Sequence, residues 1–213
     1  MSSVIVYLGE AAFISILVSA MESFPSKYQD GRKPPGTTPE GEVFGLLFGQ
    51  KISRGGSTVF NVTVAAVLQM MREKNPNGFW ASEQHTERVE TIVQAYPWLQ
   101  FLGRFHSHSW PKEDFAPCSA EFSDSDRENA CTVADEYGDE ILETIIALTY
   151  LDQKASKESV RDWPSTTNYC GNYKYVLTSY VTNRNAGELK GVDNFICPVA
   201  AAVGNYDLIA DLP

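Results

Sequence analysis

The sequence predicts one α/β domain built on a mixed β-sheet with flanking helices and long loop insertions. Two observations favour this fold class: strand and helix patterns alternate irregularly along the 213 residues, and no internal repeat divides the chain. The apolar share of 43% and the charged share of 21% are ordinary for a globular protein. We expect a single domain over residues 1–213, with a core over about residues 4–152 and C-terminal strands and loops over residues 153–213.

The first expected elements are a strand over residues 4–8 and a helix in the apolar stretch that follows. The helix is predicted because apolar residues recur at the spacing of one helix face: Phe13, Ile16, Leu17, Ala20, Met21 and Phe24. Residues 11–21 are too few to span a bilayer, and no Lys or Arg precedes them as in a signal peptide. Residues 22–41 are dense in Pro and Gly, which predicts a long loop.

The middle of the chain contains three further strand patterns and one helix pattern. Residues 42–50 and residues 57–67 are predicted strands, joined by the hairpin turn signal Arg54-Gly55-Gly56. Residues 98–106 form the third strand pattern. Between these strands, with Ser82 as a candidate N-cap, a helix is indicated by Val89, Ile92, Val93 and Tyr96 at helical spacing.

The second half of the chain repeats this mixture of patterns. Residues 123–137 are predicted to be helical, and residues 141–151 form a buried strand. Residues 152–172 are polar and are expected to be a loop. Residues 173–182 and 194–203 are two further strand candidates.

Net charge limits the kinds of partner to be expected, and the cysteine pattern limits the kinds of metal site and disulfide. The formal charge of −10 argues against a protein that tracks nucleic-acid phosphates, so we expect no nucleic-acid partner and no membrane partner. The four cysteines, at positions 118, 131, 170 and 197, contain no C-x-x-C pair, so there is no zinc-ribbon signal. We expect reduced thiols in a cytoplasmic protein, while a Cys170–Cys197 bridge stays open.

Two of the three histidines, His106 and His108, stand two residues apart at the end of a predicted strand. Side chains at i and i+2 of a strand point to the same side, so both imidazoles can reach one metal ion. Two histidines and a carboxylate are a zinc ligand set that leaves a fourth position open for water. The alternative is a strand end with two solvated histidines.

Two acidic residues could complete such a site. Asp126 lies three residues after Ser123 at the start of a predicted helix, which also matches a capping box. Glu42 opens the first strand of the hairpin, where it would be either a residue at the water boundary or a general base beside the metal. Glu40 competes with Glu42 for this second role.

Three separated motifs together resemble the signature of the JAMM (JAB/MPN) zinc metalloproteases: Glu42 in E-x-x-G-L-L-x-G, Gly103–His108, and Ser123-x-x-Asp126. The resemblance covers roughly residues 4–152 and implies a sheet flanked by helices, like that of cytidine deaminases. It implies one Zn²⁺ per chain, bound by His106, His108 and Asp126. It also implies that Glu42 is the general acid/base and that Ser123 helps to hold the oxyanion of the tetrahedral intermediate.

By the same resemblance, the protein would hydrolyse the bond after the C-terminal glycine of a ubiquitin or ubiquitin-like protein, in a conjugate or a precursor. It looks most like a stand-alone bacterial member, for which a place in an antiphage defence system is conceivable on the same grounds. The alternative is a catalytically silent scaffold of the same fold. A zinc deaminase is disfavoured because neither H-x-E nor P-C-x-x-C occurs.

The sequence departs from the family pattern between His108 and Ser123. The fourteen residues 109–122 make this spacing longer than the usual one, although added loop length costs little entropy. Trp110 and Phe115 give the insertion an apolar surface. We expect them to line one wall of the substrate groove, the alternative being that both pack inward and only hold the insertion down.

Overall fold

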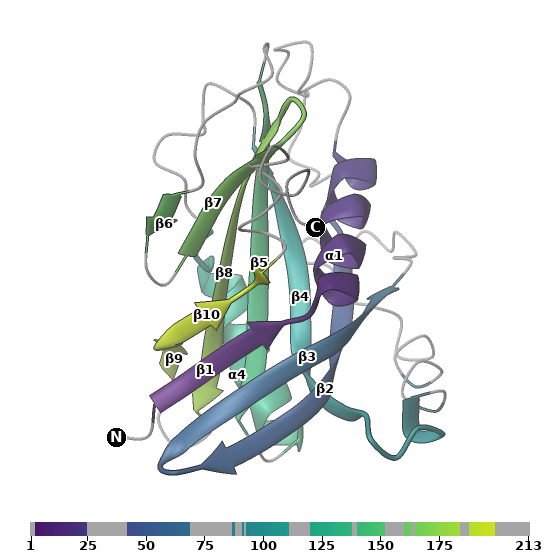
Figure 1. The fold of residues 1–213 in the computed structure, drawn as a ribbon, viewed down its shortest axis with the longest axis vertical. Coiled ribbons are helices and arrows are strands. Elements are labelled where there is room, and N and C mark those ends of the chain that lie inside the picture. The colour runs from purple at the N-terminus through teal and green to yellow at the C-terminus, as the bar shows by residue number, and fades with distance from the viewer. Residues whose placement is uncertain are drawn as a thin grey trace, which may run out of the picture.

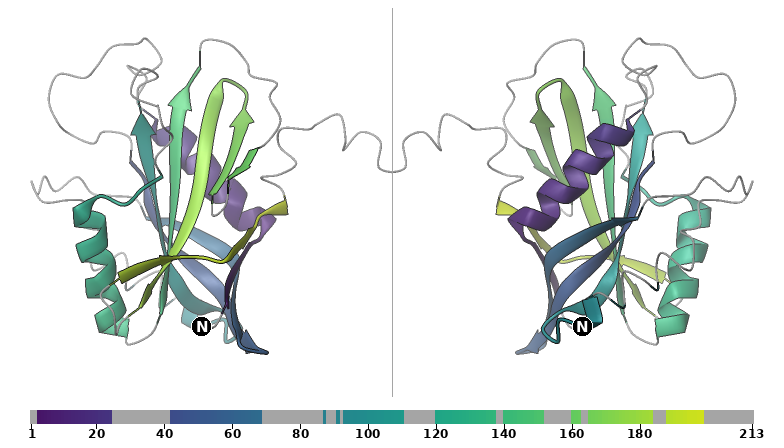
Figure 2. Two further views of the ribbon diagram at one scale, coloured as in Figure 1. Left: turned by 90° about the vertical axis from the view of Figure 1, so that its left-hand side faces the viewer. Right: turned by 90° about the vertical axis from the view of Figure 1, so that its right-hand side faces the viewer.

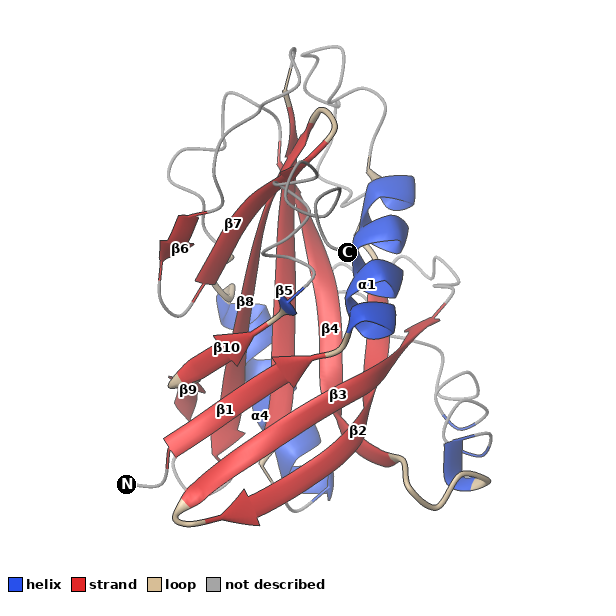
Figure 3. Ribbon diagram, viewed as in Figure 1, coloured by secondary structure: helices blue, strands red, loops and turns tan. Residues whose placement is uncertain are grey.

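The computed structural model describes residues 3–24, 42–68, 87, 91, 93–110, 120–137, 140–151, 160–162, 165–183 and 188–198. These residues form a mixed α/β structure in which strands predominate (Figure 3). The elements in chain order are β1 (Ser3–Leu8), α1 (Glu10–Ser23), β2 (Phe44–Arg54), β3 (Ser57–Leu68), β4 (Gln100–Trp110), α4 (Asp124–Tyr137), β5 (Ile141–Tyr150), β6 (Val160–Asp162), β7 (Ser165–Cys170), β8 (Tyr173–Asn183), β9 (Glu188–Gly191) and β10 (Asn194–Ile196).

All the described strands belong to one sheet. Its order is β10-β1-β3-β2-β4-β5-β8-β7-β6, and β9 pairs with β8 beside β7. Figure 1 shows β1, β3 and β10 running obliquely across the direction of β4, β5 and β8, while β2 bends from alongside β4 into the oblique direction of β3. Helices α1 and α4 lie on opposite faces of this sheet (Figure 2). The coarse expectation of a mixed sheet flanked by helices is therefore confirmed.

Helix α1 covers the larger apolar core. Phe13, Ile16 and Ala20 are fully buried, as the helical spacing of the sequence predicts. Phe13 packs against the buried Tyr175 of β8, with ring centroids 5.9 Å apart. The other face of α1 keeps Ile14 and Val18 exposed, which fits an amphipathic helix resting on a sheet.

The hairpin of β2 and β3 has the predicted turn. Gly55 and Gly56 both have positive φ, 59° and 79°, which a glycine adopts without a steric penalty. The pairing register shifts between Phe48 and Gly49, so a bulge bends the middle of the hairpin. Strand β2 also pairs with β4, which places the start of β2 beside the histidine end of β4.

Strand β4 is longer than expected. The sequence pattern ended at His106, whereas the strand continues to Trp110 because it pairs in parallel with β5 over eight residues, from Gly103 to Trp110. Because of this extension, His106 and His108 both lie within the continuous pairing of β4 with β5. Gly103 allows the close approach of the two strands, since a Cβ built there would lie 1.8 Å from the carbonyl oxygen of Leu142.

The expected loop over residues 152–172 is wrong in its second half, which contains β6 and β7. Strand β7 has the polar sequence STTNYC, yet Thr166 and Asn168 are buried against the neighbouring strand. Pairing with β8 stabilises this segment, and such tertiary context overrides a polar composition. The strand expected over residues 194–203 is also shorter: β10 ends at Ile196, and the short strand β9 precedes it.

Other expected elements lie partly outside the described residues. Of the helix expected to end near Tyr96, the described residues 87, 91, 93 and 94 are helical and Val93 is buried. Tyr96 itself lies in a turn and is 46% exposed, so it does not continue the buried helix face. The long Pro- and Gly-rich segment from residue 25 to residue 41 falls outside the described part. Among the described residues, no helix has the length and apolar character that crossing a membrane requires.

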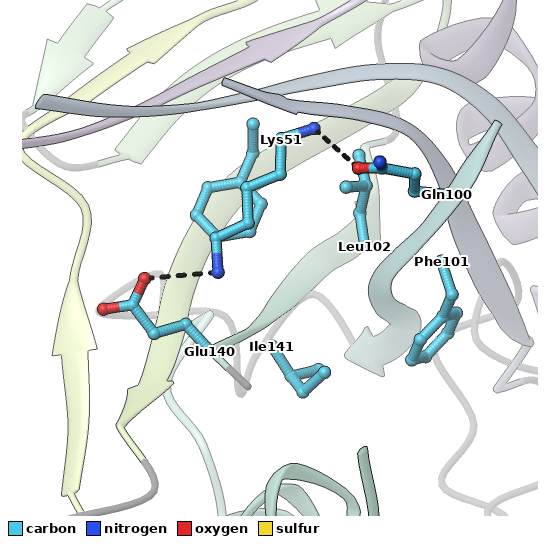
Figure 4. A pocket seen from close by; sticks show the side chains of 7 residues that line it. Lys51, Gln100, Phe101, Leu102, Glu140 and Ile141 are labelled. Atoms are coloured by element: carbon cyan, nitrogen blue, oxygen red, sulfur yellow. Dashed lines mark hydrogen bonds and ion pairs between the residues drawn. The ribbon is translucent and has the colours of Figure 1, made fainter. Parts of the chain in front are cut away.

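A shallow cavity opens beside the first residues of β4 (Figure 4). Across it, the Lys51 ammonium lies 3.5 Å from the Glu140 carboxylate. Gln100 and Leu102 belong to the end of β4 opposite to His108, so this cavity is separate from the histidine motif. Its full lining is Lys51, Phe60, Gln100, Phe101, Leu102, Glu140 and Ile141.

Candidate metal centre

The histidine motif and the start of α4 meet on one face of the sheet. His106 and His108 point to the same side of β4 because side chains alternate along a strand. Helix α4 begins at Asp124 on that side, which brings Asp126 in its first turn against both imidazoles. His106, His108 and Asp126 form the one group among the described residues whose donor atoms could share a metal ion.

The three donor atoms form a compact triangle. The Nε2 atoms of His106 and His108 are 3.1 Å apart. Each lies 3.7 Å from an oxygen of Asp126: His106 from Oδ1 and His108 from Oδ2. Ligand atoms at about 2.0–2.1 Å from a tetrahedral zinc lie about 3.4 Å from one another, so these edges fit one face of a zinc tetrahedron. Two imidazoles and a carboxylate are also a donor set that suits zinc.

The capping box predicted at Ser123 is present, and it orients the third ligand. The Ser123 hydroxyl donates to Asp126 Oδ2 at 2.6 Å, and the Ser123 backbone N–H donates to the same oxygen at 2.9 Å. In return, the Asp126 backbone N–H donates to Ser123 Oγ at 3.2 Å. Capping and metal ligation are therefore compatible in Asp126, because the cap fixes the carboxylate that faces the histidines.

The electrostatics of the triangle favour the protonation states that a metal needs. Burial, with smaller contributions from His108 and Arg104, lowers the pKa of His106 to about 3, so its imidazole is neutral at pH 7. Burial acts to raise the pKa of Asp126, but His108, His106 and Ser123 outweigh it and hold that pKa well below the usual range. A neutral imidazole and an ionised carboxylate are the forms that bind metal ions.

Glu42 lies beside this triangle. Phe44 pairs with His106, so the register continued by two residues sets Glu42 opposite His108 on the same face. Burial is the main cause that raises the pKa of Glu42 to about 7; His108 acts against this shift and Asp126 adds to it. A carboxyl that exchanges its proton near neutral pH has the property required of a general base at that pH. The competing Glu40 lies outside the described residues.

Ser107 was not singled out from the sequence. Ser107 lies between the two histidines in the sequence, but its side chain is fully buried and points to the opposite face of β4, into the core. Its hydroxyl accepts a hydrogen bond from the Val43 backbone N–H at 2.8 Å, and its own N–H donates to the Val43 carbonyl at 2.9 Å. The available signal was its position between two candidate ligands, but its partner depends on the β2–β4 register.

The sequence also did not reveal a buried ion pair between β4 and β5, which lies two residues before His106. Arg104 donates from Nε to Glu143 Oε1 at 2.8 Å, and its Nη2 lies 2.6 Å from the same oxygen. The two residues are direct neighbours in the β4–β5 register. The signal in the sequence was Glu143, a charged residue within a strand that is otherwise almost wholly apolar. The pair satisfies a buried carboxylate close to the ligands.

The aromatic residues of the insertion are only partly described. Trp110 packs against the small apolar cluster that contains Phe122, and its ring centroid lies 6.4 Å from that of His108. Its indole Nε1 is buried without a hydrogen-bond partner among the described residues. Trp110 therefore borders the site with its ring against the core. Phe115 lies outside the described residues.

Two other aspartates, Asp124 and Asp114, stand near the motif residues in the sequence and have carboxylates that could replace Asp126 as the third ligand. Asp124 is exposed at the first position of α4 and does not belong to the donor group, whereas Asp114 lies outside the described part. Among the described residues, Cys131, Cys170 and Cys197 form no disulfide bond with one another.

No model of a known protein family matches the sequence, and no curated protein matches it at a significant level.

Proposed function

We propose that this protein is a zinc-dependent isopeptidase or peptidase of the JAMM type, with a cytidine-deaminase-like sheet. The observation that carries the proposal is a zinc-sized donor triangle with the Glu42 carboxyl beside it, on the same face of the sheet and opposite His108. In the metal-free site, burial raises the pKa of this carboxyl. His106, His108 and Asp126 would hold the zinc, and Glu42 would be the general acid/base. The motif resemblance supports the same assignment of roles.

When bound, zinc supplies Lewis acidity, which lowers the pKa of a water ligand to about 7 and polarises a carbonyl oxygen. Glu42 then accepts a proton from the attacking water as the new C–O bond forms. The same carboxyl delivers that proton to the leaving amine as the C–N bond breaks, so one group serves as base and acid. The products are a carboxylate and an amine.

Ser123 would have two roles in this scheme. In the resting site its hydroxyl donates to Asp126 and keeps that carboxylate in place. During the reaction the hydroxyl would turn to the oxyanion of the tetrahedral intermediate, where a preorganised donor stabilises developing charge. The second Ser123–Asp126 contact, from the backbone N–H at 2.9 Å, would hold Asp126 meanwhile.

The proposed substrates are ubiquitin or ubiquitin-like proteins, joined through a C-terminal glycine to a lysine or to a precursor extension. This part of the proposal rests on the resemblance of the three motifs. On the same basis we propose that the protein acts in the bacterial cytoplasm, within a ubiquitin-like conjugation system of antiphage defence.

The direct test is a cleavage assay with zinc-loaded protein and a panel of ubiquitin-like proteins that carry a C-terminal fluorogenic amide. We expect release of the amine from at least one panel member, and loss of activity after chelation and its return with zinc. Glu42→Gln keeps the shape of the side chain but accepts no proton, so it should lower the rate by about 100-fold or more while zinc stays bound.

Near-normal cleavage by Glu42→Gln would assign the proton transfer to another carboxyl, with Glu40 the first candidate. Tight capture of a ubiquitin-like protein without cleavage, by a zinc-loaded wild type, would instead support the silent scaffold.

A further inference from the structure

We propose that Ser107 positions Glu42: its buried hydroxyl fixes the peptide that carries the proton acceptor of the site. This inference rests on the proposed function, because it concerns the residue on which proton transfer depends. Ser107 itself faces the core, on the side of β4 opposite to His106 and His108, so it acts through the backbone of β2 and touches neither ligand nor substrate.

The pairing of Val43 with Ser107 departs from a regular antiparallel ladder. In such a ladder two facing residues exchange both backbone hydrogen bonds. Here the Ser107 N–H donates to the Val43 carbonyl at 2.9 Å, but the Val43 N–H donates to the Ser107 hydroxyl at 2.8 Å. The side chain thus replaces the backbone carbonyl as acceptor, next to the last regular pair, Phe44 with His106.

The position of this hydrogen bond makes it relevant to Glu42. The Val43 N–H belongs to the peptide group that links Glu42 to Val43, so the bond fixes the orientation of the backbone from which the Glu42 side chain extends. Val43 is 8% exposed and Ser107 is fully buried, so water cannot readily supply a substitute acceptor. Without the hydroxyl, a buried N–H is left unsatisfied and the segment is free to shift.

A general base is sensitive to such a shift. Proton transfer needs heavy atoms within hydrogen-bond reach, and a misplacement of about 1 Å can lower a rate by about 100-fold. Zinc binding should be far less sensitive, because the ligands lie on β4 and α4 and not on β2. Loss of the Ser107 hydroxyl should therefore lower kcat while zinc content and KM stay close to their wild-type values.

The test compares Ser107→Ala with Ser107→Thr and with a matched control. Threonine keeps the hydroxyl acceptor in a strand, so it should restore much of what alanine loses. The control is Ser179→Ala: Ser179 is equally buried, and its hydroxyl lies 2.8 Å from that of Thr144, on strands β8 and β5. This control removes a buried hydrogen bond of the same kind without contact with β2.

We expect kcat of Ser107→Ala to fall by about 10-fold to 100-fold, with KM and zinc content within about threefold of wild type. Ser107→Thr should return kcat to within about threefold, and Ser179→Ala should lower thermal stability but leave kcat unchanged. An equal loss of kcat in Ser107→Ala and Ser179→Ala would reduce Ser107 to a stability residue and overturn the proposal.

A double variant tests whether Ser107 acts through Glu42. If it does, Glu42→Gln combined with Ser107→Ala should be no slower than Glu42→Gln alone, because the positioned group is already missing. Multiplication of the two losses would contradict the proposal.

Hydrogen exchange of the Val43 amide gives a readout that needs no substrate. Exchange should be faster in Ser107→Ala than in wild type or Ser179→Ala. Unchanged exchange would show that the Ser107 hydroxyl does not hold the Val43 amide. A wild-type protein that cleaves no member of the panel would overturn the proposed function, and the amide exchange would still decide whether the hydroxyl holds Val43.

Discussion

Asp126 combines two structural tasks in one side chain. Its carboxylate accepts two hydrogen bonds from Ser123 and also faces both imidazoles at 3.7 Å. A residue in the first turn of the helix therefore also joins the helix to β4. A change at Asp126 should affect metal binding much more than folding, since a lost cap costs only about 1 kcal/mol.

We therefore predict that Asp126→Ala retains its fold but loses most of its zinc, because two histidines alone bind zinc weakly. Asp124→Ala is the matched control: this aspartate stands in the same helical turn but is exposed and outside the donor group. Metal analysis after gel filtration measures the difference. Full zinc content in Asp126→Ala would move the third ligand elsewhere, to Asp124 or Asp114.

Glu42 should leave a signature in the pH dependence of stability of the zinc-free protein. Its pKa rises from 4.5 to about 7 on folding, so between these values the folded state keeps a proton that the unfolded state has lost. The free energy of unfolding should therefore fall as the pH rises through this window. His106, whose folded pKa is about 3, contributes in the opposite direction.

Subtracting the unfolding free energy of Glu42→Gln from that of wild type isolates the Glu42 contribution. The difference should favour wild type increasingly as the pH is lowered from about 7 to about 5. Urea unfolding at several pH values measures it, and a difference independent of pH would show that Glu42 titrates normally.

The sequence supplied the residues of the site because their types and spacings are local. Each motif is short: His106 and His108 lie on one strand, and Ser123 and Asp126 lie at the start of one helix. The structure brings these two motifs together with Glu42. Ser107 and the Arg104–Glu143 pair could not be assigned a role in this way. Their partners are decided by strand register, which depends on the whole sheet.

Strand β4 joins the site to the fold at the level of elements. Its parallel pairing with β5 keeps residues 103–110 extended, and its antiparallel pairing with β2 brings Glu42 close. The close approach of β5 depends on Gly103, whose φ of 153° and lack of a Cβ leave room for Leu142. A side chain at position 103 should therefore push β4 away from β5 and displace the histidines further along the same strand.

We predict that Gly103→Ala lowers the free energy of unfolding by roughly 3 kcal/mol or more and weakens zinc binding as well. Gly55→Ala is the control: Gly55 also has a positive φ, but a Cβ there meets nothing within 4 Å. Its cost should be only about 1 kcal/mol, with zinc retained. Denaturant unfolding and metal analysis check both, and equal effects of the two variants would contradict the role given to Gly103.

Elements with strong apolar patterns were predicted well, and those that depend on pairing were not. The helical spacing around Phe13 and the apolar run of β5 identify their elements without knowledge of neighbours. Strand β7 is polar and β9 has only four residues, so no local period indicates them. Strand β10 was expected, but as part of a longer strand over residues 194–203. These strands exist because β8 and β1 offer edges to which they pair.

At the scale of the whole molecule, the last described strands connect the two flanks of the sheet. Strand β9 pairs with β8, and β10, which follows within a few residues, pairs with β1. Asp193 lies between them: its N–H donates to the Val4 carbonyl at 2.8 Å, and its carboxylate accepts from the Val4 N–H at 2.7 Å. The strands after residue 152 are thus part of the same sheet as the metal face.

This connection has a consequence for the order of events during protein synthesis. Strand β1 leaves the ribosome well before its partner, because the residue that pairs with Val4 follows 189 positions later. One edge of β1 must therefore stay uncovered while the intervening residues are made, and closing so distant a contact is slow. Until β10 arrives, that edge can pair with another nascent chain, so the growing polypeptide should depend on chaperones most strongly between the synthesis of β1 and that of β10.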